Sequence, residues 1–313
     1  MTAYIIRRLL ATIPVMVVVA IFVFLLLHLT PGDPAAVIAG DDATPEAVDG
    51  IRTKLGLDQP IHVQFGIYAA NLLRGDLGTS IFSNLPVLTL VKQRLEPTLV
   101  LAASTLVMAV LLAIPMGVLA AWKARNFIDR LVMGFSVLGF AVPGFLVGYL
   151  LIYVFAIELK WLPVQGYRPL SQGIDQTARS IILPALALSM AYMALIARMT
   201  RASMLDVLSQ DYIRTAKAKG VATLIVLLRH ALKNAAVPIV TVIGIGLTLL
   251  ISGVVITETD FNIPGLGRLT VDAILKRDYP IIQGLIILFA GAKVLVNLLI
   301  DISYVFFDPR IRY

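Results

Sequence analysis

Six long apolar runs dominate this sequence and limit the folds open to it. The runs extend approximately over 9–29, 99–121, 131–157, 181–197, 237–256 and 281–300. A helix needs about 20 mostly apolar residues to cross a bilayer, because its backbone polar groups must be satisfied within the helix itself. With 59% hydrophobic and 14% charged residues, the chain is too apolar for a soluble domain. We therefore predict an all-α polytopic membrane protein with six transmembrane helices.

The first apolar run follows Arg7 and Arg8, as it would in a secretory signal peptide. The run is longer than the apolar stretch of a signal peptide, and the residues from Leu27 to Asp33 contain no small-x-small cleavage pattern. We expect residues 1–29 to be retained as the first transmembrane helix.

The distribution of charge predicts the orientation in the membrane. If the amino terminus is cytoplasmic, the inner segments hold 14 of the 26 Lys and Arg residues but only 4 of the 19 Asp and Glu residues. Cytoplasmic loops of membrane proteins carry an excess of Lys and Arg. We therefore expect both termini to be cytoplasmic. The net charge of +7 then reflects topology rather than nucleic-acid binding.

Catalytic and metal-binding patterns are weak in this chain. It has no Cys, and its three histidines, His28, His62 and His230, are too scattered for metal-ligand spacing. The Gly-Leu-Gly stretch at 265–267 lacks the GxxxxGK[ST] arrangement of a nucleotide-binding loop. We expect no catalytic residue, no metal site and no cofactor bound by this chain.

The segment 30–97 between the first two runs is interrupted by Pro31, Pro34, Pro45, Pro60 and Pro86. A helical pattern extends from Thr44 to Leu55, where Thr44 can cap the helix and Pro45 occupies its first turn. We predict a small folded outer subdomain here. It could pack on the mouth of the helix bundle, or it could contact another protein or a substrate directly.

The segment 198–236 is predicted to be helical, then turned, then helical again. Thr215, Ala216 and Ala218 are small, and Gly220 can end a helix in the left-handed conformation. A short exposed helix followed by such a turn is a surface that another protein could bind. Contact of the Lys and Arg side chains with anionic lipid would explain the charge equally well.

Several motifs occur in order along nearly the whole chain. The amino-terminal motifs are YIIRRLL, LHLTPGDP, KLGLDQPI and GDLGTS, and the later ones are FNIPGLGRL, VDAILKRDYPIIQG and NLLIDISYVFFDPRIRY. Between them lies DYIRTAKAKG with LLRHALKNA. Together, in this order, they resemble the permease subunits of dipeptide/oligopeptide/nickel-type ABC importers, the binding-protein-dependent transport system inner membrane component family. The middle segment resembles the family's coupling loop, whose general pattern is EAAxxxG.

The resemblance implies a type I ABC importer permease fold, in a bacterial inner membrane, that moves di- or oligopeptides inward by alternating access. It implies these partners: a second permease subunit in a heterodimer, two ATPase domains that bind ATP and Mg, and an extracytoplasmic substrate-binding protein. The implied domains are 1–29, 30–97, a core at 98–307 with a coupling loop at 198–236, and a tail at 308–313.

A nickel chelate or another small solute is the alternative cargo. From another class, a secondary transporter or proton-linked respiratory subunit would need ionisable groups in several spans, whereas one span carries the clear candidates.

By the same resemblance, one set of residues is expected to couple to the ATPase: Arg214, Thr215, Ala216, Lys217, Ala218, Lys219, Gly220, Leu224 and Ile225. His230 and Lys233 stand where the general family pattern has an apolar residue and a Pro, which is usual in the peptide branch. The stretch 222–225 is more apolar than in most members. We therefore expect an unusually apolar contact with the ATPase.

Two further groups of residues are candidates for function. Lys293, Asn297 and Asp301 recur at a spacing of four in the last run, which places them on one helical face. They could form a polar stripe that holds helices together, or line the translocation path.

The second group lies in the predicted outer loop 257–280, where prolines and glycines shape a turn with Phe261 and Leu266 as exposed apolar tips. This loop could pack on neighbouring helices, or contact the binding protein and help to release substrate. The residues in question are Phe261, Pro264, Gly265, Leu266, Gly267 and Arg268.

Overall fold

The computed structural model describes residues 2–29, 33–40, 43–54 and 56–307. The chain divides into two compact units, the first formed by 1–95 with 268–295 and the second by 96–267 with 296–313. In the described residues regular structure is helical, apart from an isolated bridge between Thr79 and Pro86. The predicted all-α class is confirmed. The expected domains 1–29, 30–97 and 98–307 stay a prediction; the nearest observed boundary lies between Leu95 and Glu96. The expected tail 308–313 lies outside the described residues.

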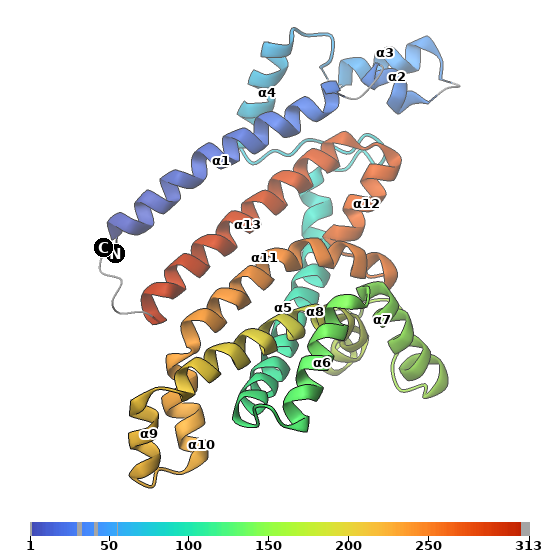
Figure 1. Cartoon of the computed structure of the whole chain (residues 1–313). Helices are drawn as coiled ribbons and strands as arrows, with labels where there is room; N and C mark the ends of the chain where they lie inside the picture. Colours follow the sequence, from blue (N-terminus) through green and yellow to red (C-terminus); the bar gives the residue numbers. More distant parts are fainter. Residues whose placement is uncertain (1, 30–32, 41–42, 55, 308–313) are drawn as a thin grey trace. The chain divides into compact units, whose positions relative to one another are not determined.

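The first unit contains one long apolar helix followed by short helices, and it is completed by later segments of the chain (Figure 1). Its elements are α1 (Thr2–Leu29), α2 (Pro34–Ala39), α3 (Pro45–Lys54), α4 (Ile61–Leu73), and parts of α5 (Val87–Trp122), α12 (Leu266–Lys276) and α13 (Tyr279–Phe307).

Local hydrogen bonds fix the short helices of the first unit. The backbone N–H of Ala47 donates to Thr44 Oγ1 at 3.3 Å, so Thr44 caps α3 as predicted. Asp33 caps α2 in the same manner. Arg52 of α3 forms ion pairs with both Asp33 and Asp49, which joins the two helices. The segment between the first two apolar runs is therefore folded, as expected.

α4 packs against the end of α1. The ring of Phe24 lies 5.2 Å from that of Phe65 in an edge-to-face contact, and Tyr68 lies beside it. His28 Nε2 donates to the side-chain oxygen of Gln64 at 3.0 Å. These contacts hold α4 against α1.

The second unit is built around α8, which packs against α6, α7 and α11 (Figure 1). Its elements are most of α5, then α6 (Phe127–Ala141), α7 (Gly144–Leu151), a π-helical segment (Ile152–Glu158), a 3₁₀ turn (Leu170–Gln172), α8 (Ile174–Leu208), α9 (Asp211–Ala218), α10 (Thr223–Ile225), a second π-helical segment (Val226–Leu232), α11 (Ala236–Asp260) and the end of α13.

Small residues allow the helices of the second unit to approach closely. A Cβ added to Gly117 of α5 would lie 2.5 Å from Thr200 Cβ on α8, and one added to Gly139 of α6 would lie 3.0 Å from Ala194 Cβ. Helices in membranes associate largely through such close packing, because lipid offers no hydrophobic driving force between them. Glycine at these two positions therefore sets the distance of α5 and α6 from α8.

Five described helices are long and apolar enough to cross a membrane, and a sixth span is present if a bent pair is counted as one. The bent pair is α6 with the helix from Gly144 to Glu158, whose axes differ by 107°. The span expected over 131–157 is therefore present as a bent pair and not as one unbroken helix. Pro143 has no N–H to continue the ladder and keeps Val142 extended, at φ −88° and ψ 123°.

The fourth span is longer than expected. α8 covers 35 residues, whereas the apolar run covers only 181–197. The parts of α8 outside the apolar run carry polar residues such as Asp175 and Arg201. These residues interrupt the apolar sequence pattern, but the helix continues through them. The hydropathy pattern therefore located the apolar middle of α8 but not its polar ends.

Candidate functional site

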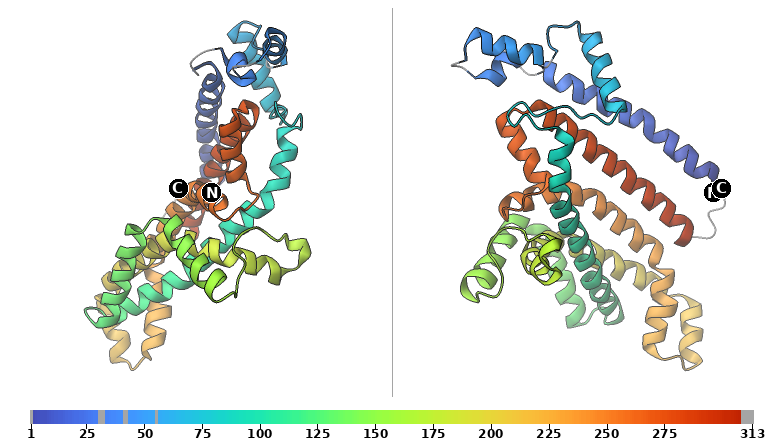
Figure 2. Two further views of the ribbon diagram at one scale, coloured as in Figure 1. Left: turned by 90° about the vertical axis from the view of Figure 1, so that its right-hand side faces the viewer. Right: turned by 180° about the vertical axis from the view of Figure 1, so that it is seen from behind.

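The second unit carries an exposed helical hairpin formed by residues 211–232, which we call the α9 hairpin. It consists of α9, α10 and the π-helical segment that leads toward α11. Figures 1 and 2 show α9 and α10 side by side, extending beyond the ends of α8 and α11. The helix–turn–helix predicted for 198–236 is thus present, with α9 before the turn at Gly220 and α10 after it.

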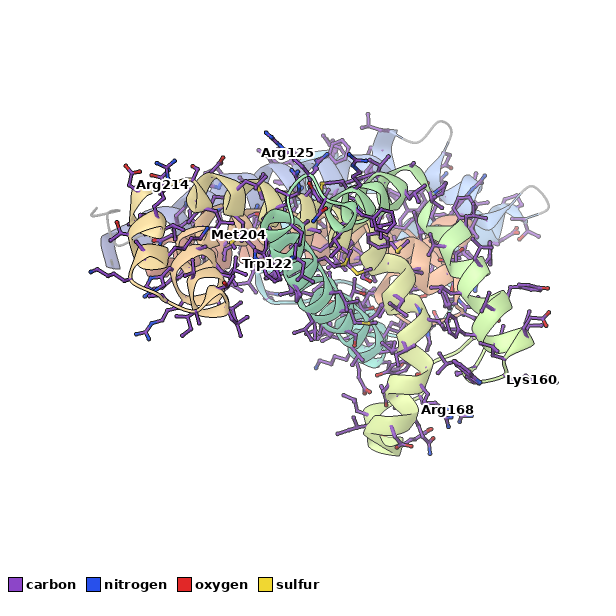
Figure 3. All side chains as sticks on the ribbon, turned by 60° about the horizontal axis from the view of Figure 1, so that its bottom comes forward. Trp122, Arg125, Lys160, Arg168, Met204 and Arg214 are labelled. Atoms are coloured by element: carbon purple, nitrogen blue, oxygen red, sulfur yellow. The ribbon has the colours of Figure 1, made fainter. Side chains whose placement is uncertain are left out.

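The α9 hairpin is anchored by an apolar cluster beneath it. Ile213 of α9 is fully buried, as are Met204 of α8 and Val226 of the π-helical segment. Figure 3 shows Met204 among the helices and Arg214 on the hairpin at the edge of the unit. The cluster comprises Val118, Ala121, Met204, Ile213, Val226, Leu227, Ala231, Ala235 and Ile239. Because α5, α8, α9 and α11 all contribute, the hairpin is held by three long helices.

A left-handed glycine forms the tip of the hairpin. Gly220 has a φ of +77°, as predicted, and the backbone N–H of Val221 donates to Ala216 O at 3.2 Å. A Cβ at Gly220 would meet nothing within 4 Å. Glycine is therefore required by the backbone conformation and not by a lack of space.

The expected ATPase-coupling residues form one exposed surface. Leu224 is 65% exposed and Ile225 is 46% exposed, although both are large and apolar. Ala216 is half-buried, and the remaining members, Arg214, Thr215, Lys217, Ala218, Lys219 and Gly220, are exposed. The surface thus combines an apolar pair with a basic helix, which suits binding of a protein more than packing within this chain.

The segment after α7 lies at the other end of the same unit. Figure 3 places Lys160 and Arg168 far from Arg214. In this region the hydroxyl of Tyr167 and the N–H of Leu170 both donate to Glu96 Oε1, each at 2.8 Å. Burial and this hydrogen bond raise the pKa of Tyr167 above its usual range, so the phenol stays protonated and able to donate.

The predicted apolar tips at Phe261 and Leu266 are wrong. Phe261 is 3% exposed and Leu266 is 2% exposed. A Cβ at Gly148 of α7 would lie 3.0 Å from Phe261 Cε2, which shows how closely the ring packs there. Of the six residues named for this segment, only Pro264 is exposed, and Arg268 is half-buried.

A buried carboxylate, which the sequence did not reveal, organises this turn. Glu258 of α11 is fully buried, and Thr98 Oγ1 donates to its Oε1 at 2.5 Å. Thr98 Oγ1 in turn accepts from the N–H of Leu266 at 2.8 Å. A Cβ at Gly265 would lie 2.1 Å from Glu258 Oε1. The glycines that suggested an exposed turn therefore make room for a buried acid.

The three polar residues of α13 have different surroundings. Lys293 and Asn297 are exposed and Asp301 is half-buried. Asn297 accepts a hydrogen bond from Thr248 Oγ1 of α11 at 3.2 Å. Eight residues of helix span about 12 Å, so Lys293 and Asp301 are too far apart along α13 for a direct ion pair. A packing role for Asn297 has structural support, and a role for Lys293 stays a prediction.

An ion pair between α6 and α8 was also missed by the sequence analysis. Arg201 Nε and Nη2 donate to the two carboxylate oxygens of Asp129 at 2.5 and 2.7 Å. The Asp129 side chain is 6% exposed. Because 72 residues separate the partners, sequence spacing gave no signal for this contact.

A cavity of about 600 Å³ lies within the first unit. It is bounded by the end of α1, α4, the segment 76–84 and the start of α13. Burial raises the pKa of Tyr68, one of its lining residues, to about 12. None of the sequence-predicted site residues lines it.

Comparisons with known proteins agree with this architecture. The family described as binding-protein-dependent transport system inner membrane component matches residues 113–313, and its amino-terminal counterpart matches 1–102. The chain is 55% identical to the probable peptide ABC transporter permease protein y4tP of Sinorhizobium fredii, and 44% identical to the glutathione transport system permease protein GsiC of Escherichia coli K12. Both similarities cover 100% of each chain.

A solved structure shows the same fold. An inward-facing structure of the MetNI methionine ABC transporter matches with a TM-score of 0.59 and 15% sequence identity, over 71% of this chain and 97% of that chain. This likeness confirms the type I permease fold expected from the sequence.

Proposed function

Because this chain belongs to the binding-protein-dependent transport system inner membrane component family, we propose that it is the permease subunit of an ATP-driven importer of di- or oligopeptides. The structural observation that carries the proposal is the α9 hairpin. It is exposed, anchored by a buried cluster and joined directly to membrane-spanning helices. Such a hairpin can receive a force from a partner and transmit it to the spans.

The cargo is inferred from the full-length relatives. One is named for peptide transport and another for glutathione, which is itself a small peptide. These names favour a peptide-like solute over a nickel chelate.

Several subunits would share the transport process. We infer that it supplies half of a translocation path and that a second permease subunit supplies the other half. Two ATPase domains would bind ATP and Mg beneath the α9 hairpin, and an extracytoplasmic binding protein would deliver the peptide. Both termini would then lie in the cytoplasm of a bacterial cell, and the end of the unit near Lys160 would face outward.

The remaining candidate residues receive narrower roles. We infer that Asn297 joins α13 to α11 through its hydrogen bond with Thr248, so the polar stripe serves helix packing. A release role for 261–268 would now depend on the exposed Asn262 and Pro264, since Phe261 and Leu266 are buried.

Reconstitution in proteoliposomes tests the proposal. The permease pair, the binding protein and a labelled tripeptide would be combined with the ATPase subunits present or absent. We expect uptake only with the ATPase subunits and ATP. Uptake without them, driven by a proton gradient, would establish a secondary transporter instead.

A further inference from the structure

The Asp129–Arg201 ion pair lies where the α9 hairpin joins the bundle. Arg201 is on α8, about two turns before that helix ends. One turn further along, Met204 is fully buried in the cluster that holds Ile213 of α9. A displacement of the hairpin must therefore move the end of α8 that carries Arg201.

The geometry of the pair fixes α6 relative to α8. The guanidinium donates two hydrogen bonds to one carboxylate, and such a two-point contact restricts orientation as well as distance. Asp129 Oδ2 also accepts from the N–H of Arg125 at 2.8 Å. Arg125 has a φ of 67°, so the carboxylate holds the turn between α5 and α6 in a conformation that L-residues rarely adopt.

The charges around the pair indicate how Arg201 would behave without Asp129. Arg125 and Arg130 flank Asp129 in the α5–α6 region, and Arg198 lies one turn before Arg201 over the ring of Phe140. Asp129 is the acid among these cations. Without it, Arg201 would turn toward water, and α8 would lose its polar contact with α6.

α6 is joined to α7 by a short connection, and both helices pack against α8. The 107° bend at Val142 and Pro143 connects α6 to α7, and α7 also packs against α8. Gly148 of α7 contacts the ring of Phe261 after α11. The pair therefore connects the base of the hairpin, through α6, to the opposite end of the unit.

We propose that Asp129 and Arg201 are positioning residues that make movement of the α9 hairpin move α6 and α7, so that ATP hydrolysis and transport remain coupled. This inference rests on the proposed function as a permease. Burying an ion pair contributes little net stability compared with apolar packing, so we assign this pair to fixing the geometry of α6 and α8. Loss of the pair leaves the hairpin anchored by its apolar cluster while α6 no longer follows it.

The test measures ATP hydrolysis and peptide uptake in the same proteoliposomes, with the complete complex. We expect Arg201→Ala and Asp129→Asn to retain at least half of the hydrolysis rate but to reduce peptide transported per ATP about tenfold. Arg201→Lys keeps the charge but loses the two-point contact, and it should fall between these values. Arg130→Ala is the matched control, because Arg130 is an exposed arginine next to Asp129; it should keep the wild-type ratio.

A covalent bridge gives a second, independent readout. The chain has no Cys, so Asp129→Cys with Arg201→Cys provides a unique pair of thiols. Joining them with a short bifunctional thiol reagent should raise transport per ATP toward the wild-type ratio. Mass spectrometry of the bridged peptides verifies the reaction.

Several outcomes would overturn the inference. These are an unchanged ratio in Arg201→Ala, a proportional fall of hydrolysis and uptake, loss of the assembled complex in every variant, or a verified bridge that restores nothing. A wild-type complex without peptide-stimulated ATP hydrolysis would instead refute the proposed function.

Discussion

Gly220 and Gly265 are both required, but for different physical reasons. Gly220 stands in open space and is required for its positive φ, whereas Gly265 stands against a buried carboxylate and is required for its small size. Substitution of Gly220 should disturb the exposed turn of the α9 hairpin. Substitution of Gly265 should disturb the packing around Glu258.

At Gly220, a change to Val should impair the turn of the α9 hairpin. A β-branched residue in the left-handed region is disfavoured by roughly 1–2 kcal/mol. We expect Gly220→Val to lose peptide-stimulated ATP hydrolysis and uptake while membrane insertion persists. Gly220→Asn, which tolerates positive φ, should retain much of both activities. Normal uptake by a well-expressed Val variant would contradict this account of the turn.

At Gly265, a change to Ala should destabilise the protein itself. The added Cβ would lie 2.1–2.3 Å from the Glu258 carboxyl group, so side chains or backbone must shift. Overpacking of this kind costs about 1–3 kcal/mol. We expect a lower thermal midpoint in detergent for Gly265→Ala. The matched control is Gly134→Ala, since a Cβ there meets nothing within 4 Å; equal midpoints for the two variants would show that Glu258 does not occupy this space.

Among the elements, α9 depends on a single buried residue for its attachment. α9 has eight residues, and Ile213 is the one residue of this helix that is buried. An isolated helix of that length is not stable in water, so its order derives from packing.

Truncation at Ile213 should therefore loosen the hairpin. Removing a buried Ile side chain to Ala costs about 2–5 kcal/mol. We expect Ile213→Ala to increase hydrogen exchange throughout 211–232 while exchange in the middle of α8 is unchanged. Tyr212→Ala, at a neighbouring exposed position, should leave exchange near the wild-type level. Equal exchange in both variants would mean that the cluster does not anchor the hairpin.

Local sequence patterns predicted some elements well and others poorly. Thr44 and Pro45 located α3, and Gly220 located the hairpin turn, because caps and positive φ depend on neighbouring residues. The break of the third span at Pro143 was overlooked, since apolar residues flank it on both sides and hydropathy does not change there.

Contacts between distant residues could not be predicted from one sequence. Asp129 and Arg201 are 72 residues apart, and Thr98 and Glu258 are 160 residues apart. Phe261 and Leu266 were misjudged for the same reason, because their burial depends on helices whose arrangement a local pattern does not contain.

On the scale of the whole molecule, the proposed function requires exposed surfaces that partner proteins can bind. Leu224 and Ile225 remain exposed at one end of the second unit, and Lys160 and Arg168 lie at the other (Figure 3). An importer driven by ATPase partners needs the hairpin end, and only that end, to contact them.

Crosslinking from single cysteines tests this central claim most directly, because the chain has no Cys of its own. Leu224→Cys and Lys160→Cys would each be introduced into the assembled complex and treated with a short thiol-to-amine crosslinker. We predict that Leu224→Cys crosslinks to the ATPase subunit and that Lys160→Cys does not. A crosslink to the ATPase from position 160, with none from 224, would contradict the account.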